Sequence, residues 1–129
     1  MHLYIHLHMQ IRKAAIEDAP AIVENNILLA NESEGEILDK SIVEQGVKNL
    51  LSHPKKGFYI VITEKEKIIG QIMITFEWSD WRNTDIWWIQ SVYVHKTYRN
   101  KGVFLALFNE IKKQAKNAQI LILRLYVHK

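Results

Sequence analysis

Residues 1–14 alternate between two kinds of side chain, which is the period of a strand with one buried face. One face would carry Leu3, Ile5, Leu7, Met9 and Ile11, and the other His2, Tyr4, His6, His8, Gln10 and Arg12. The pattern predicts a half-buried strand at the start of the chain. Met9 could also be the original first residue, in which case residues 1–8 are an extension and residues 9–129 form the domain.

Two helices are expected next. Asp18 is a natural N-cap and Pro20 suits the first turn of a helix that runs to about Asn31. A second helix begins near Asp39 or Ser41 and ends before residues 53–54, His-Pro. Its predicted buried side consists of Ile42, Val43, Val47, Leu50 and Leu51. Gly46 lies inside this helix, where glycine costs up to about 1 kcal/mol relative to alanine.

The segment between the helices, residues 31–36, is acidic and is expected to be a loop. Such a run is usually a solvated connector. It could also form a lip that attracts a cationic substrate, and the sequence leaves both alternatives open.

Apolar runs at residues 58–63, 68–76 and 86–94 predict three strands, with a polar turn at 64–67 and a loop at 77–84. Short spacing favours an antiparallel meander. Apolar residues at a helical period predict a helix from Gly102 to about Asn117. A right-handed return would then place residues 120–127 parallel to the strand at 86–94. The fold class is α+β, with a mixed, mostly antiparallel sheet flanked by helices.

Composition limits the function classes. The 129 residues, 48% hydrophobic and 24% charged, are typical of one globular domain. We find no apolar run long enough to span a membrane and no signal peptide. The absence of cysteine excludes disulfides, thiolate catalysis and cysteine-ligated zinc, and fits a reducing cytoplasm. The net charge of +3 is too small and too scattered to indicate a nucleic-acid surface.

Two further segments carry candidate chemistry. His6 and His8 share a strand face, but no third ligand accompanies them, so we assign no metal site. The turn between the apolar strand and the last helix contains Arg99, Lys101 and Gly102. A helix start has unpaired N–H groups and partial positive charge, so a basic, glycine-containing turn there predicts a phosphate site.

The order of these elements resembles the Gcn5-related N-acetyltransferase (GNAT) superfamily. The turn resembles that family's acetyl-CoA pyrophosphate motif, Gln/Arg-x-x-Gly-x-Gly/Ala. In this chain the motif positions are Arg99, Asn100, Lys101, Gly102, Val103 and Phe104. The last position departs from the pattern, because Phe104 replaces a small residue. The place of the motif, after an apolar strand and before an amphipathic helix, makes the resemblance specific.

The resemblance implies that acetyl-CoA is the co-substrate. Backbone groups of Val92, Tyr93 and Val94 would pair with its pantetheine arm, near a bulge that splays the strands. Backbone N–H groups from Arg99 to Phe104 would hold its pyrophosphate. The implied reaction is direct acetyl transfer to a primary amine of a small molecule or peptide.

An ammonium must lose a proton before it attacks, so the reaction needs a base. Glu77, expected at the end of the second meander strand, is the first candidate, and Glu34 is the second. Trp78, Trp81, Trp87 and Trp88 are candidates to line the acceptor pocket, and packing is an equal alternative for each.

The resemblance departs most at the C-terminus. A family domain continues past Val127 with another helix and two strands, which supply an asparagine near the cofactor and a tyrosine that protonates the leaving thiolate. Lacking them, residues 120–127 would form an exposed apolar edge, and we expect a homodimer through that strand. The alternative function is a catalytically weak or inactive module that binds acetyl-CoA or CoA.

Overall fold

The computed structural model describes residues 8–126, which form one five-stranded sheet and three α-helices. In chain order the elements are β1 (Met9–Lys13), the 3-10 helix η1 (Ile16–Asp18), α1 (Ala19–Glu34), α2 (Lys40–Ser52), β2 (Gly57–Glu64), β3 (Lys67–Ser79), β4 (Thr84–Val94), the 3-10 helix η2 (Lys96–Tyr98), α3 (Val103–Asn117) and β5 (Leu123–Leu125). The strands lie side by side in the order β1-β2-β3-β4-β5. Neighbours are antiparallel except β4 and β5, which are parallel. The predicted mixed sheet and parallel return are confirmed.

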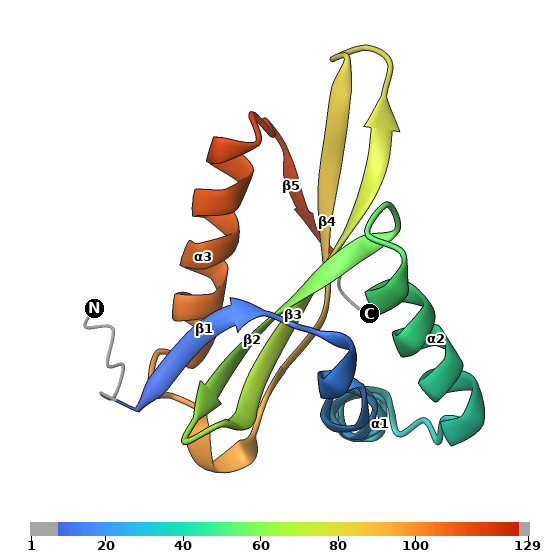
Figure 1. Ribbon diagram of the computed structural model, residues 1–129, viewed down its shortest axis with the longest axis vertical. Coiled ribbons are helices and arrows are strands. Elements are labelled where there is room, and N and C mark those ends of the chain that lie inside the picture. Colours follow the sequence, from blue (N-terminus) through green and yellow to red (C-terminus); the bar gives the residue numbers. More distant parts are fainter. Residues whose placement is uncertain (1–7, 127–129) are drawn as a thin grey trace.

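The helices cover the two faces of the sheet unequally. α3 packs alone on one face, and α1 and α2 lie on the other (Figure 1). The far ends of β3 and β4 project beyond the helices as a long hairpin (Figure 1). The core under α3 is built chiefly from Ile60, Ile62, Ile69, Ile72, Ile74, Ile89, Leu107 and Ile111. The core under α1 and α2 is smaller and contains Ile22, Val23, Val47, Tyr59 and Val61.

The first helix is longer than predicted. It continues to Glu34 and ends at Gly35, whose left-handed φ of 64° turns the chain back so that its N–H caps the carbonyls of Ala30 and Asn31. Residues 31–34 are therefore helical, and the prediction of a loop there was wrong. No helix breaker precedes Gly35, which explains the extension.

The start of α1 also differs from the prediction. Asp18 holds the N-cap position but its carboxylate makes no bond to the helix. It accepts two hydrogen bonds from the Arg12 guanidinium, at 2.7 and 2.9 Å. A bidentate charged pair is stronger than a neutral cap, so Asp18 links β1 to α1 instead.

α2 confirms Asp39 as its N-cap, because Asp39 Oδ1 accepts from the backbone N–H of Ser41 at 2.9 Å. Its buried side is narrower than predicted. Val47 is buried, whereas Ile42 is 67% exposed and was wrongly placed in the core.

The strands confirm the meander but shift its boundaries. The turn between β2 and β3 uses Lys65 and Glu66 at φ of 49° and 70°, the left-handed pair that a two-residue hairpin requires, although neither is glycine. β3 runs to Ser79 and β4 begins at Thr84, so Glu77 belongs to a strand and the predicted loop at 77–84 shrinks to four residues.

At each end of the chain the described residues contain part of a predicted strand. The predicted alternation is confirmed for Met9–Lys13, where Met9 and Ile11 turn toward the core, whereas His6 lies outside the described residues. β5 covers three residues of the predicted 120–127 strand, whose last residue, Val127, is also outside them. No helix in residues 8–126 has the length and apolar character to cross a membrane.

Candidate functional site

A bulge interrupts β4 at its centre. Gln71 of β3 pairs with Tyr93, but Met73 pairs with Gln90, so Ile72 faces two residues of β4 instead of one. The extra residue is Ser91, which has a left-handed φ of 49°. An inserted residue exchanges the two faces of a strand. Before the bulge Ile89 packs in the core under α3, and after it Val92 and Val94 pack there.

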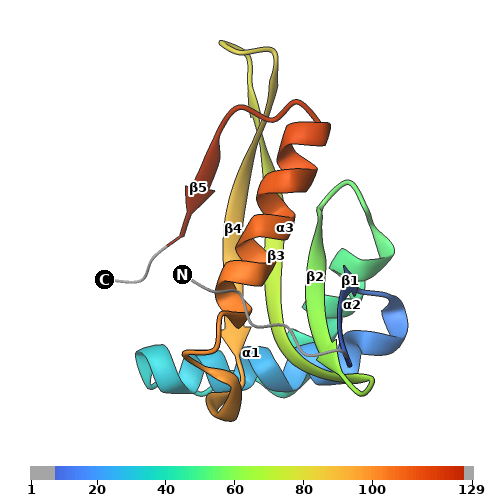
Figure 2. The ribbon, with the colours of Figure 1, turned by 90° about the vertical axis from the view of Figure 1, so that its left-hand side faces the viewer.

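The bulge coincides with the point where β4 loses its second neighbour. β5 pairs only with the segment from Trp87 to Ile89. β5 ends at Leu125, opposite Ile89, and the Tyr126 N–H donates to the Ile89 carbonyl at 3.0 Å (Figure 2). Within residues 8–126 the C-terminal part of β4 therefore pairs with β3 on one side and with no strand on the other, and we call this side the open edge.

The open side exposes backbone groups of the segment predicted to bind pantetheine. The His95 N–H donates to the Ile69 carbonyl of β3 at 2.9 Å. Because successive residues of a strand direct their backbone groups to opposite sides, those of Val94 and Val92 point away from β3. The Val94 carbonyl accepts from Arg99 Nε at 2.9 Å on that side. The geometry suits an extended ligand chain that adds to the open edge.

The predicted phosphate turn lies at the end of this edge. η2 leads to Asn100 and Gly102, whose φ values of 62° and 82° are left-handed, and α3 starts directly afterwards. The first bond of the helix joins Ala106 N–H to the Gly102 carbonyl at 3.0 Å, so the N–H groups of residues 103–105 precede it. A cavity of about 230 Å³ lies at this helix start, lined by Val94, Tyr98, Arg99, Asn100, Gly102, Val103, Phe104 and Leu105.

Phe104, the residue that departs from the family motif, does not fill this cavity. It is 44% exposed and stacks on Phe108 one turn later, with ring centres 5.9 Å apart. The cavity of about 230 Å³ remains beside the stacked ring, so Phe104 does not close the predicted phosphate site.

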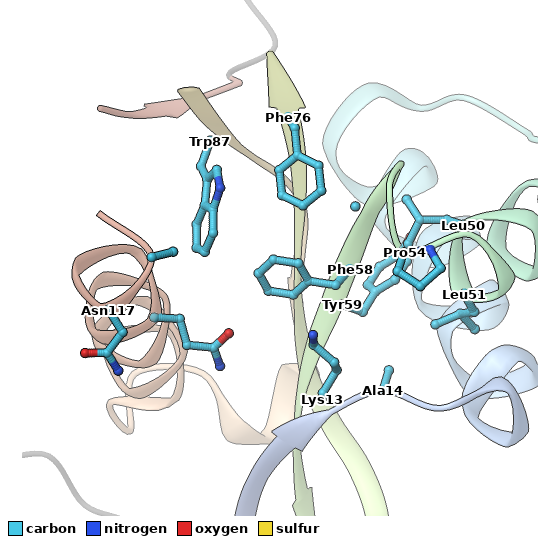
Figure 3. A pocket seen from close by; sticks show the side chains of 13 residues that line it. Lys13, Ala14, Leu50, Leu51, Pro54, Phe58, Tyr59, Phe76, Trp87 and Asn117 are labelled. Carbon is cyan, nitrogen blue, oxygen red and sulfur yellow. The ribbon is translucent and has the colours of Figure 1, made fainter. Parts of the chain in front are cut away.

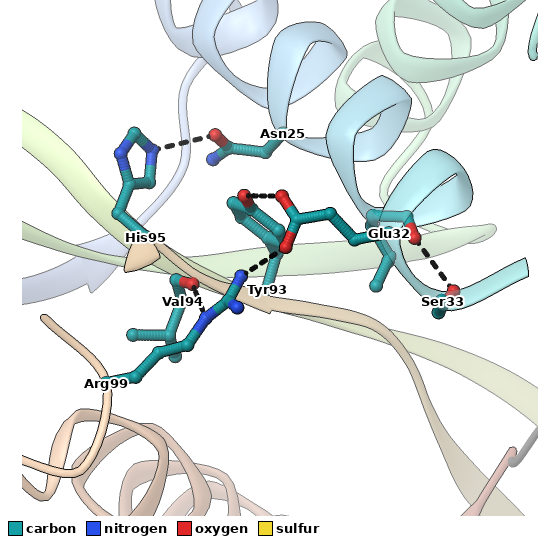
Figure 4. A network of polar contacts seen from close by, with 8 residues as sticks. Asn25, Glu32, Ser33, Tyr93, Val94, His95 and Arg99 are labelled. Carbon is teal, nitrogen blue, oxygen red and sulfur yellow. Dashed lines mark hydrogen bonds and ion pairs between the residues drawn. The ribbon is translucent and has the colours of Figure 1, made fainter. Parts of the chain in front are cut away.

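A carboxylate from α1 holds the arginine of the turn. Glu32 Oε1 accepts from Arg99 Nη2 at 2.6 Å, and its other oxygen accepts from the Tyr93 hydroxyl at 2.6 Å (Figure 4). We call this group the Glu32 clasp. These two bonds, first that from Tyr93 and then that from Arg99, lower the pKa of Glu32 below its ordinary value. The clasp therefore stays charged at neutral pH.

Behind the bulge lies a buried network of side-chain amides. Gln71 is fully buried in β3. Its Nε2 donates to the Ser91 carbonyl at 3.0 Å and to Asn26 Oδ1 at 2.8 Å, and its Oε1 accepts from Asn25 at 3.0 Å. Both N–H donors and the oxygen of the Gln71 amide thus have partners, in three hydrogen bonds, as burial of an amide requires.

The Ser91 carbonyl determines which groups of the network donate hydrogen bonds and which accept them. The Ser91 oxygen can only accept, so Gln71 must present its amino group there and its oxygen to Asn25. Asn25 must then present Oδ1 to His95 Nε2, which lies 3.0 Å away (Figure 4). His95 is consequently protonated on Nε2. Burial, and next the charges of Lys67 and Arg99, lower the pKa of His95, which keeps it neutral.

A second cavity, of about 450 Å³, lies between α1 and α2 and reaches the bulge. Glu34 and Ser91 are both among its lining residues. The other base candidate, Glu77, lies elsewhere. It accepts from Trp88 Nε1 at 2.8 Å and lies 3.8 Å from an Arg124 guanidinium nitrogen, so it joins β3, β4 and β5.

A larger cavity of about 540 Å³ is not part of this arrangement. The rings of Phe58, Phe76 and Trp87 converge in it, and the Lys13 ammonium points toward Phe58 (Figure 3). Asn117 at the C-terminal end of α3 also lines it, whereas the phosphate turn is at the other end of that helix.

The tryptophans do not line the cavity between α1 and α2. Trp87 belongs to the aromatic cavity and Trp88 bonds to Glu77. Trp78 and Trp81, at the end of the β3–β4 hairpin, are 61% and 91% exposed.

Comparison with known proteins agrees with this geometry. The family model for the acetyltransferase (GNAT) family matches residues 24–129. The chain belongs to the acetyltransferase (GNAT) family. A possible acetyltransferase from Clostridium difficile 630 is 48% identical, with a TM-score of 0.89 over 94% of this chain and 80% of its own. A search of curated proteins gave no significant match.

Two solved structures of lower identity share the fold. An integron cassette protein from the mobile metagenome of Cole Harbour Salt Marsh is 24% identical, with a TM-score of 0.85 over 92% of this chain and 77% of its own. A predicted acetyltransferase from Clostridium acetobutylicum, solved with acetyl-CoA, is 21% identical, with a TM-score of 0.77 over 94% of this chain and 82% of its own.

Sequence reasoning did not find Gln71, Asn25, His95 or the role of Glu32. Gln71 could have been identified from the sequence, because it is a polar residue inside an apolar strand that is buried on both faces. Glu32 had been noticed only as one charge of an acidic run.

We predict that Gln71→Met lowers the free energy of unfolding by about 2 to 4 kcal/mol, because it leaves buried amide and carbonyl groups unpaired. Chemical denaturation measures the loss. We also expect His95 to lose its fixed Nε2–H tautomer, which nitrogen NMR of the imidazole detects. The control is Gln10→Met on exposed β1, where a change within about 0.5 kcal/mol is expected. Equal losses in both variants would contradict the role of the network.

Proposed function

We propose that this protein transfers the acetyl group of acetyl-CoA to a primary amine of a small molecule or peptide. The observation that supports the proposal is the continuity of two features, an open β4 edge after the bulge and a phosphate-sized cavity at the start of α3. The pantetheine arm would add to the edge at Val92 and Val94, with Tyr93 paired to β3. The pyrophosphate would bind the N–H groups from Arg99 to Phe104, between which lie Asn100, Lys101, Gly102 and Val103.

The reaction would be direct. The ammonium loses a proton to a base, the neutral nitrogen attacks the thioester carbonyl carbon, and the nitrogen then gives up a second proton to solvent. The new C–N bond converts the carbonyl oxygen to an oxyanion, which the Val92 N–H on the open edge would stabilise. The C–S bond then breaks, the carbonyl re-forms, and the coenzyme A thiolate leaves and takes a proton from solvent.

Arg99 would have to move for the arm to bind fully. In the structure Arg99 Nε donates to the Val94 carbonyl, and Glu32 accepts a second hydrogen bond from the same guanidinium. The coenzyme's phosphates would compete with Glu32 for Arg99, so Glu32 should weaken coenzyme binding. A protein of the same fold from Clostridium acetobutylicum was solved with acetyl-CoA, which supports the choice of ligand.

Of the two base candidates, the geometry favours Glu34. It lines the cavity that reaches Ser91, next to the proposed oxyanion donor. Glu77 bonds to the Trp88 indole and is not among the residues that line this cavity.

We also propose a homodimer through β5 and, from the cysteine-free composition, a cytoplasmic location. β5 is the outermost described strand on its side of the sheet. Leu121, Leu125 and Tyr126 are 75%, 54% and 66% exposed around it. An apolar strand with a free edge favours pairing with another strand.

The first test is calorimetric titration with acetyl-CoA. We expect the parent to bind and Arg99→Glu to bind about 10- to 100-fold more weakly, since a charge-assisted contact is replaced by repulsion. Glu32→Gln should bind about two- to fivefold more tightly, because the competing carboxylate is removed. Equal affinity of the parent and Arg99→Glu would exclude the assigned turn.

The second test is steady-state acetyl transfer to a panel of primary amines. Glu34→Gln should lower kcat by about 100-fold, the usual contribution of a general base. Glu77→Gln should lower kcat less than Glu34→Gln does. A larger loss of kcat in Glu77→Gln would assign the base to Glu77. Coenzyme binding without transfer to any amine would favour the binding-module alternative.

For the dimer, light scattering coupled to size exclusion should give twice the chain mass for the parent. Leu125→Lys should give a monomer, because a charge at the edge strand opposes pairing. The control is Leu28→Lys, at an exposed apolar position on α1. A monomeric parent would refute this part of the proposal.

A further inference from the structure

Gly46 lies in the middle of α2, where the backbone conformation does not require a glycine. Gly46 is an ordinary helical residue without a positive φ, and a Cβ added there would meet no atom within 4 Å. Glycine in this position costs about 1 kcal/mol relative to alanine. Neither conformation nor close packing explains it.

Gly46 is exposed and lies on the same face of α2 as Val43, Val47 and Leu50, and all four line the cavity between α1 and α2. A side chain added at Gly46 would therefore extend over this cavity. Its walls are mainly apolar and come from both helices and the segment before α2, namely Leu29, Ala30, Leu38, Val43, Val47 and Leu50. Met73 and Ser91 contribute from the sheet. A volume of about 450 Å³ is within the range of small-molecule sites.

The buried polar side chains near the cavity are already paired with one another. In residues 8–126 every buried side-chain nitrogen and oxygen has a hydrogen-bond partner. Tyr59, which lines the cavity, accepts from Asn26 at 3.1 Å. A ligand with a polar body would lose its hydration against mainly apolar walls, which is unfavourable. The lining residues that carry charge, Glu34 and Glu36, are exposed.

We propose that this cavity binds the body of the acceptor, and that the acceptor is a primary amine with a branched aliphatic or aromatic body. Gly46 is the residue that sets the size of the body. The inference rests on the proposed acetyl transfer, which requires an amine to reach Ser91 and the neighbouring open edge. The exposed carboxylates favour approach of the cationic ammonium form.

The test uses the full chain, the variant Gly46→Leu and three probe amines. 2-Phenylethylamine has an apolar body, n-propylamine is small, and spermidine is polar along its length. The parent should show a kcat/KM for 2-phenylethylamine at least about tenfold above that for spermidine. Gly46→Leu should reduce the ratio of 2-phenylethylamine to n-propylamine by about tenfold or more, because leucine occupies the cavity.

Two measurements separate occlusion of the cavity from damage to the fold. Leucine is a better helix former than glycine and its Cβ has free space, so the melting temperature of Gly46→Leu should not fall. Gln45→Leu introduces the same side chain at the neighbouring exposed position of α2, outside the cavity, and should keep the parent's ratio. The same loss of ratio in Gln45→Leu would overturn the assignment.

Binding is measured in parallel by the shift of the Gly46 and Val47 amide signals on addition of 2-phenylethylamine. A shift in the parent that is absent for the Val47 amide of Gly46→Leu supports the apolar amine site, even if no transfer is detected and the proposed reaction fails. Acetyl transfer with no preference for 2-phenylethylamine, or with a ratio unchanged by Gly46→Leu, refutes the inference and leaves the proposed function standing. No shift in the parent also refutes it.

Discussion

The site depends on the hydrogen bond from Gln71 Nε2 to the Ser91 carbonyl, 3.0 Å long and inside the sheet. Ser91 is held at a left-handed φ, which costs a non-glycine residue on the order of 1–3 kcal/mol unless its surroundings compensate. The bulge it forms exchanges the faces of β4. With it, Tyr93 turns toward Glu32 on the α1 side, and Val92 and Val94 turn toward α3. Without it, each of these side chains would lie on the opposite face.

Arg99 has two roles in the proposed site: it stabilises the free protein, and it would bind the coenzyme. In the described structure Arg99 is satisfied internally, by a carboxylate from α1 and by the Val94 carbonyl. Both contacts stabilise the turn when no anion is bound. The same two contacts occupy the groups that the proposed coenzyme would use, so stability of the free protein and affinity for its ligand oppose each other at this residue.

The order of elements could be predicted from the sequence because each has a strong periodic signal. The basic turn between an apolar strand and an amphipathic helix was equally visible, so the phosphate cavity was expected at Arg99–Phe104. The Ser91 bulge was expected only through the family resemblance, because no local residue type marks it. Asp18 holds the predicted N-cap position, but its bond to Arg12 could not be predicted, since that pair depends on a strand and a helix meeting in space. Contacts such as Glu32–Arg99, between residues 67 positions apart, have no periodic signature at all.

α1 takes part in both halves of the proposed site. Its last turns carry Glu32 toward the phosphate turn, while Leu29 and Ala30 wall the cavity between the helices. If coenzyme binding shifts α1, the wall of the cavity shifts with it. The two substrates would then be thermodynamically linked, and linkage is reciprocal: whatever factor the coenzyme imposes on the affinity for the amine, the amine must impose on the affinity for the coenzyme.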